Sequence, residues 1–148
     1  MKRILIFLFM VTLFMTLVAC SYNGRNAQII YTQWDNNTET GKYFIIDSVD
    51  ELNEYIDINN EQRLSNNVEG FAKSFFEDSS LVIVLVSEGS GCVSHKIKSI
   101  KVNEDIIDIT VKRNVPELGT FDMSECTIIF EVTKEEASNI KDVNLILK

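Results

Sequence analysis

Apolar residues along the chain gather in short runs, and the strongest of these runs is at residues 81–86. Six consecutive apolar residues, Leu-Val-Ile-Val-Leu-Val, end at the polar, glycine-rich segment 87–91. A run this short, with so many β-branched residues, predicts a strand that is buried on both faces. We therefore expect it to be the central strand of a sheet.

Downstream of this run, apolar and polar residues alternate with the period of two that is typical of strands. Residues 93–102 and 106–113 are two such segments, and the polar residues 103–105 between them predict a hairpin. The phase of the first segment changes between Ile97 and Ile100, which predicts a β-bulge near Ser99. Two further strands are expected at residues 126–133 and 143–147.

Upstream of the central run, residues 28–34 and 42–46 are rich in β-forming residues. The turn-rich segment 35–41 lies between them. This order predicts a hairpin with a long loop.

Three segments have the pattern of short helices. Ser48 and Glu51 have capping-box spacing ahead of an amphipathic stretch, and Thr133 and Glu136 repeat that spacing near the C-terminus. Residues 68–76 carry apolar residues at helical intervals. Together the patterns predict an α+β fold, a mostly antiparallel sheet of about six or seven strands with two or three short helices.

The N-terminus has the features of a bacterial export signal. Basic residues at positions 2 and 3 precede an apolar run that is short for a membrane-spanning helix and typical of a signal peptide. The next residues, Leu17-Val18-Ala19-Cys20, resemble the lipobox of bacterial lipoproteins. The resemblance implies cleavage after residue 19 and lipidation of Cys20 with fatty acyl chains such as palmitate. A plain signal peptide and an uncleaved anchor are the alternatives.

Cleavage after residue 19 would leave a chain organised as a tether and one domain. Residues 20–27 are polar and predict a short flexible tether, and residues 28–148 are enough for a single α+β domain. The full chain carries a formal charge of −8, which argues against nucleic acid as a partner. The expected location is the extracytoplasmic side of the cell membrane, attached through lipid.

Few residues offer catalytic or metal chemistry. His95 is the only histidine, so a metal site with several histidines is excluded. A zinc site would need Cys92, His95, Cys126 and Asp122 to converge. Cys92 and His95 also have the residue types of a nucleophile and a base, but on a strand residues three apart point to opposite faces. No cofactor or metal is therefore expected.

The C-terminal half resembles a known family. The segments of this half are, in order, the apolar strand, the Gly-Ser-Gly break, the hairpin 96–113, the segment Val-Pro-Glu-Leu-Gly-Thr at 115–120 and the strand that ends at residues 130–132. The order of these segments resembles that of the C-terminal domain of the protease complex subunit PrcB family. The likeness covers roughly residues 75–133. It implies a non-catalytic accessory module that binds another secreted protein, such as a protease.

Two function classes remain open at this point. The first is a binding module whose partner contacts come from the glycine turn and the long loop 114–125. The residues predicted to make those contacts are Gly89, Ser90, Gly91, Pro116, Phe121, Asp122 and Met123. The second class is a cell-envelope enzyme based on the Cys92 thiol or on an acid pair such as Asp122 and Glu125.

The cysteine count predicts a disulfide. Once Cys20 is lipidated, Cys92 and Cys126 are the two cysteines that remain in an oxidising compartment. Both stand near the start of predicted strands, so we expect them at the same rim of the sheet and bonded to each other. Two buried thiols are the first alternative, and a reactive Cys92 is the second.

Overall fold

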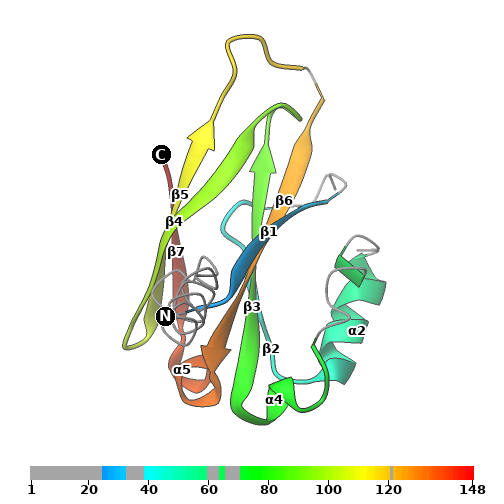
Figure 1. The fold of residues 1–148 in the computed structure, drawn as a ribbon, viewed down its shortest axis with the longest axis vertical. Helices are drawn as coiled ribbons and strands as arrows, with labels where there is room; N and C mark the ends of the chain where they lie inside the picture. Colours follow the sequence, from blue (N-terminus) through cyan, green and yellow to red (C-terminus); the bar gives the residue numbers. More distant parts are fainter. Residues whose placement is uncertain (1–24, 33–38, 60–63, 66–70, 121) are drawn as a thin grey trace, which may run out of the picture.

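Two β-sheets packed face to face make up the body of the protein (Figure 1). The computed structural model describes residues 25–32, 39–59, 64–65, 71–120 and 122–148. One sheet has the order β1-β6-β3-β2 and the other has the order β4-β5-β7. The strands are β1 (Ala27–Thr32), β2 (Tyr43–Ile46), β3 (Ser79–Glu88), β4 (Ser94–Asn103), β5 (Ile106–Asn114), β6 (Ser124–Thr133) and β7 (Asp142–Leu147). The α+β prediction is confirmed, and of these strand pairs β5 with β7 is the parallel one.

The predicted central strand is confirmed. Strand β3 lies between β6 and β2, and both of its faces are covered. Val82, Val84 and Val86 face the three-stranded sheet, whereas Leu81, Ile83 and Leu85 face the opposite side of the sheet. A strand covered on both faces needs apolar residues at every position, which accounts for the unbroken run.

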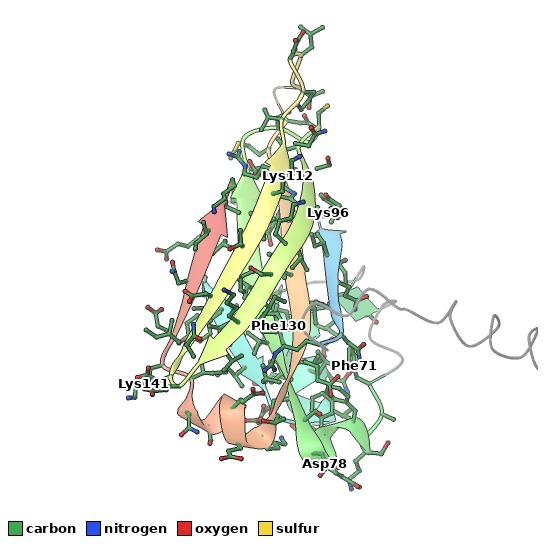
Figure 2. All side chains as sticks on the ribbon, turned by 60° about the vertical axis from the view of Figure 1, so that its left-hand side comes forward. Phe71, Asp78, Lys96, Lys112, Phe130 and Lys141 are labelled. Atoms are coloured by element: carbon green, nitrogen blue, oxygen red, sulfur yellow. The ribbon has the colours of Figure 1, made fainter. Side chains whose placement is uncertain are left out.

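The core between the sheets is formed by the alternating residues of the later strands. Its members include Ile107, Ile109, Val111, Cys126, Ile128 and Phe130, and each of these side chains is at most 1% exposed. Figure 2 shows Phe130 inside the sandwich. The predicted bulge is confirmed by a register shift between Ile97 and Ser99. Because of this extra residue, both Ile97 and Ile100 belong to the core despite their opposite phase.

In the described part of the chain, helices α2 (Val49–Asn59) and α4 (Phe75–Asp78) pack on the other face of the four-stranded sheet. The predicted start of α2 is confirmed, because the amide of Glu51 donates to Ser48 Oγ at 3.2 Å. Leu52 and Tyr55 of α2 are buried against the sheet. Among the residues that the structure describes, no helix is long and apolar enough to cross a bilayer.

The helix predicted at residues 68–76 is largely wrong. Helix α4 begins only at Phe75, residues 71–74 are not helical, and residues 68–70 lie outside the described part of the chain. The rings of Phe71, Phe75 and Phe76 instead pack edge to face. The ring centroids are 4.7 Å apart for Phe71 and Phe75 and 5.0 Å apart for Phe75 and Phe76. These aromatic contacts bury the apolar side chains without the cost of nucleating a longer helix.

The predicted hairpin of the first two strands is also wrong. Strands β1 and β2 lie at opposite edges of the four-stranded sheet, because β1 pairs with β6 and β2 pairs with β3. Strands β3 and β6, whose residues are mostly buried, pair with each other at the centre. Strands β1 and β2 form the outer edges, where most of their residues are only half-buried.

The last helix, α5 (Lys134–Asn139), begins with the predicted capping box, in which Thr133 and Glu136 exchange hydrogen bonds. Glu136 also accepts a hydrogen bond from Arg25 at 2.9 Å, and the amide of Glu131 donates to the carbonyl of Asn26. Arg25 and Asn26, which were predicted as part of the tether, therefore contact the fold. Residues 20–24 lie outside the described residues.

We expect the Arg25–Glu136 pair to add acid sensitivity to the fold. The hydrogen bond from Arg25 is the main cause that lowers the pKa of Glu136 from 4.5 to about 2. A carboxylate with a lowered pKa stabilises the fold above its unfolded pKa, and this contribution is lost as the pH falls from about 4.5 towards 2. As the pH is lowered over that range, the free energy of unfolding of Glu136→Gln should therefore fall less steeply than that of the wild type.

Urea unfolding at several pH values measures this slope. The contribution should be about 1 kcal/mol or less, because the pair is partly exposed. Glu135→Gln is the matched control, since it makes the same change at an exposed neighbour on the same helix. Parallel pH curves for the wild type and Glu136→Gln would contradict the prediction.

Candidate functional site

Two segments meet at one end of the sandwich, and we call them together the tip. The first is the turn at residues 89–92 after β3, and the second is the loop at residues 115–123 between β5 and β6. Figure 1 shows both segments at the end opposite α5. The predicted partner-binding residues all belong to this tip, apart from Phe121, whose structure lies outside the described residues.

Ser90 joins the two segments of the tip. Its hydroxyl oxygen accepts the amide hydrogen of Thr120 at 3.0 Å and lies 3.2 Å from the Thr120 hydroxyl. Its carbonyl accepts a hydrogen bond from the hydroxyl of Ser124 at 3.0 Å. These contacts fix the long loop to the turn, so the tip has a defined shape even though it contains no regular secondary structure.

Gly91 and Asp122 make the closest approach within the tip. The amide of Gly91 donates to the carbonyl of Asp122 at 2.9 Å. A Cβ atom at Gly91 would lie 2.5 Å from Oδ2 of Asp122, so any other residue here would require the Asp122 side chain to move. Hydrogen bonds, first from the Thr120 side chain and then from backbone amides, lower the pKa of Asp122. Asp122 therefore helps to hold the tip together.

Large apolar side chains project from this framework. Leu118 is 90% exposed, Val115 is 60% exposed and Met123 is 45% exposed. Pro116 is half-buried. Met123 and Pro116 were predicted from the sequence as contact residues, whereas Leu118 and Val115 were not. Their signal was the same as that of Met123, an apolar residue in a segment without strand or helix periodicity.

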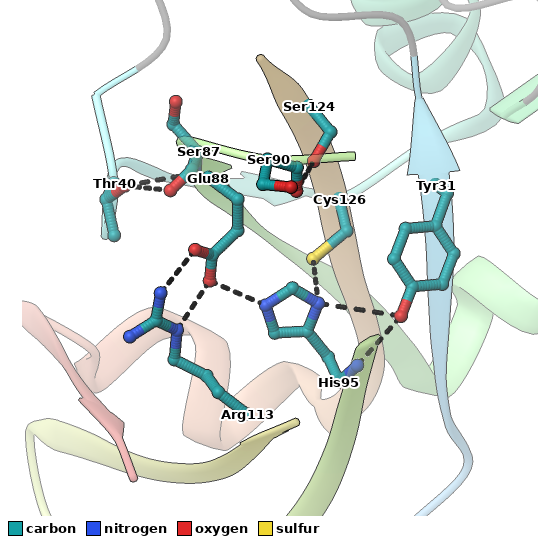
Figure 3. A network of polar contacts seen from close by, with 9 residues as sticks. All are labelled: Tyr31, Thr40, Ser87, Glu88, Ser90, His95, Arg113, Ser124 and Cys126. Carbon is teal, nitrogen blue, oxygen red and sulfur yellow. Dashed lines mark hydrogen bonds and ion pairs between the residues drawn. The ribbon is translucent and has the colours of Figure 1, made fainter. Parts of the chain in front are cut away.

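A buried charge network lies beneath the tip (Figure 3). Glu88 ends β3, and its side chain is only 3% exposed. Arg113 on β5 donates to both of its oxygens, from Nε at 2.7 Å and from Nη2 at 2.5 Å. His95 on β4 lies with Nε2 at 2.8 Å from Oε1 of Glu88, and its side chain is 1% exposed. The network connects three strands from both sheets.

The charge of Glu88 is maintained despite its burial. Burial alone would raise the pKa of Glu88, but the hydrogen bonds from Arg113 and His95 outweigh this effect, so the pKa is lowered. The same contact with Glu88 raises the pKa of Arg113. Glu88 and Arg113 are therefore an ion pair at neutral pH, with one partner almost fully removed from water.

The network continues from His95 to a thiol. Nδ1 of His95 lies 3.6 Å from Sγ of Cys126 and 3.5 Å from the hydroxyl of Tyr31. Carboxylate, imidazole and thiol thus follow one another as in a nucleophilic site. However, Cys126 is fully buried, and this burial is the main cause that raises the pKa of its thiol to about 12. Since the thiolate is the nucleophile, this environment opposes catalysis.

The predicted Cys92–Cys126 disulfide is not formed in the structure, where both thiols are free. Strand β6 begins at Ser124, so Cys126 lies inside the strand opposite Val86 and not at the rim. Cys92 lies in the exposed turn, and its sulfur is 3.4 Å from the Thr120 hydroxyl. The expectation that both residues stand at one rim of the sheet was wrong.

The two thiols should differ sharply in reactivity. In the folded protein, a water-soluble thiol reagent should modify Cys92 readily and leave Cys126 unmodified, because Cys126 is buried and its thiolate is scarce. Both should react after denaturation without reductant. Mass spectrometry of the labelled peptides measures this, with Cys92→Ser as the control. Rapid labelling of Cys126 in the folded state would contradict the burial, and two unreactive sulfurs after denaturation would indicate a disulfide.

The other predicted chemical sites do not assemble. The acids Asp122 and Glu125 differ in environment, since Asp122 is exposed in the tip and Glu125 is buried in β6. Within the described part of the chain, no three histidine, cysteine or acidic side chains gather as they would around a metal ion. His95 and Cys92 also have different partners, Glu88 and Thr120.

Comparisons with known proteins returned no match, either to a family model, to a curated protein or to a solved structure.

Proposed function

We propose that the protein is a lipid-anchored, extracytoplasmic binding module whose apolar tip docks on another secreted protein. The observation that carries the proposal is the position of Leu118, Val115 and Met123, which are exposed together at one end of the fold. Exposed apolar residues that are grouped on a fixed framework are typical of interaction surfaces. A protease is the partner class that the PrcB-like motifs imply.

The position of the tip relative to the anchor supports the proposal. Arg25 contacts the carbonyl of Glu131 and the carboxylate of Glu136, at the α5 end of β6. Strand β6 runs from the tip to that end over ten residues, a length of about 33 Å. Figure 2 shows the same long axis, with Lys112 towards the tip and Lys141 near the other end.

The length of the tether limits the distance between the lipid and the α5 end. Five residue steps separate Cys20 from Arg25, which span at most about 18 Å when fully extended. A lipid on Cys20 therefore keeps the α5 end close to the membrane, and the tip lies at the opposite end of the fold. An upright orientation of the domain would present the apolar side chains of the tip to other proteins.

The anchor is tested by Cys20→Ser. Because the acyl chains would be the attachment, the variant should either be released to the medium or accumulate as an uncut precursor. Fractionation and the mass of the mature protein measure both outcomes. Cys92→Ser is the matched control, and it should remain in the membrane fraction. A Cys20→Ser protein that is processed and retained like the wild type would show that the anchor is elsewhere.

The docking is tested by a photoreactive amino acid at position 118 in intact cells. Capture of no protein at this position would contradict the proposal.

A second candidate function, a thiol enzyme, is favoured by one observation, the order of Glu88, His95 and Cys126. The burial of Cys126 opposes it. The thiol-labelling experiment distinguishes the two candidates, because an enzyme of this type requires a Cys126 that reacts in the folded state.

A further inference from the structure

Hydrogen bonds join the two sheets on both sides of the sandwich, and a groove opens on one of them. On the side of β1 and β4, the amide of His95 donates to the hydroxyl of Tyr31 at 2.8 Å. The hydroxyl of Tyr43 on β2 donates to the carbonyl of Lys141, directly before β7, at 2.9 Å. On the side of β2 and β7, an open groove of about 800 Å³ separates the two sheets, a size typical of ligand sites. We call it the edge groove, and Val143, Leu145, Tyr43, Glu39, Asp108 and Asp142 are among the residues that line it.

Both walls of the edge groove are edge strands, since β2 ends one sheet and β7 ends the other. The amide of Lys148 donates to Val111 of β5, and the amide of Asp142 donates to Asp105, directly before β5. Because backbone groups alternate in direction along a strand, the amides and carbonyls of Val143 and Leu145 point away from β5, on the groove side. The amide of Val143 donates to Oδ1 of its neighbour Asp142 at 2.8 Å. Proline and lysine, which commonly block such edges, do not occur within β7.

The groove is negatively charged. Glu39, Asp108 and Asp142 contribute carboxylates to its lining. Asp108 is held in place by the side-chain amides of Asn103 and Asn144, each at 2.9 Å. The lysine in the lining, Lys42, directs its ammonium group over the ring of Phe44 at 5.2 Å.

We propose that the edge groove binds an extended segment of another polypeptide that carries lysine or arginine side chains and adds as a strand along β7. Strand addition would satisfy the outward carbonyl of Val143 and the outward amide and carbonyl of Leu145, and the carboxylates would select basic side chains. A second copy of this chain is disfavoured as the occupant, because the chain carries a net charge of −8. This site is separate from the tip.

The first test uses two synthetic five-residue peptides, one alternating valine with lysine and one alternating valine with glutamate. They are titrated into the full chain in detergent, and backbone amide resonances are followed. The lysine peptide should bind, with its largest shifts at Val143 and Leu145, and the glutamate peptide should bind at least about tenfold more weakly. Equal binding of the two peptides, or shifts confined to the tip, would overturn the proposal.

Variants of the protein provide the second test. Asp108→Asn combined with Asp142→Asn should weaken binding of the lysine peptide by about three- to tenfold, the range for two partly exposed ion pairs. Asp50→Asn combined with Asp57→Asn removes the same charge from exposed positions on α2 and should leave the affinity unchanged. Leu118→Asp in the tip should also leave it unchanged, which separates this site from the proposed docking surface. Unchanged affinity in the Asp108 and Asp142 double variant, or a dimer of the chain that occupies β7, would overturn the proposal.

Discussion

Replacement of Glu88 by alanine is expected to lower the free energy of unfolding by about 2 to 3 kcal/mol. The Glu88 side chain is 3% exposed and accepts hydrogen bonds from Arg113 through both of its oxygens. It also holds Nε2 of His95, whose side chain is 1% exposed. Its removal would leave the buried imidazole without its acceptor, whereas the Arg113 side chain is 35% exposed and its charge can be hydrated.

Urea denaturation of the full chain in detergent measures this loss. Glu88→Gln keeps the side-chain volume and one acceptor oxygen, so its loss should be smaller than that of Glu88→Ala. Glu117→Ala is the matched control, because Glu117 is exposed in the tip and its replacement should change stability by no more than about 0.5 kcal/mol. A Glu88→Ala protein within about 1 kcal/mol of the wild type would show that the network contributes little.

Aspartate at both Leu118 and Met123 is expected to weaken partner binding by at least about tenfold, because a charge must then be buried in an apolar interface. The melting temperature should hardly change, since Leu118 is 90% exposed and Met123 is 45% exposed in the unbound fold. Ile58→Asp is the matched control. Ile58 is also an exposed apolar residue, 73% exposed, but it lies on α2 and away from the tip.

Co-purification of the partner with each variant measures the effect on binding, and thermal unfolding measures the effect on stability. A large fall in the melting temperature of the double variant would place the two side chains in a core under their own loop. Equal loss of partner in Ile58→Asp would show that the effect is not specific to the tip.

Local sequence patterns predicted most of the strands, because each strand has at least one face in contact with a core. The unbroken run at residues 81–86 and the phase change near Ser99 each corresponded to a structural feature, a strand covered on both faces and a β-bulge. The pairing of the strands was harder to predict from local sequence patterns. The neighbours of β1 and β2 are distant in sequence, and no local signal reports that β6 and β3 are their partners.

The tip was predicted in part, and the buried network was missed. In the sequence, Glu88 was assigned to the polar segment after the central strand, His95 was considered together with cysteines, and Arg113 was only the end of a predicted strand. The alternation of inward and outward residues indicates the network, because Glu88 is in phase with the inward-facing Val82, Val84 and Val86. Arg113 likewise continues the row of Ile107, Ile109 and Val111. Polar residues in phase with a buried row are candidates for a buried network.

The most direct measurement of the central claim is in-cell photocrosslinking. A photoreactive amino acid is placed at position 118 in the tip and, as a control, at position 58 on α2, and intact cells are irradiated. If the tip is a docking surface, we expect a discrete crosslinked protein from position 118. This protein should be absent from position 58 and should be lost when Met123 is changed to aspartate. The absence of a crosslinked protein at position 118, or the same crosslinked proteins at both positions, would contradict the claim that the tip is a docking surface.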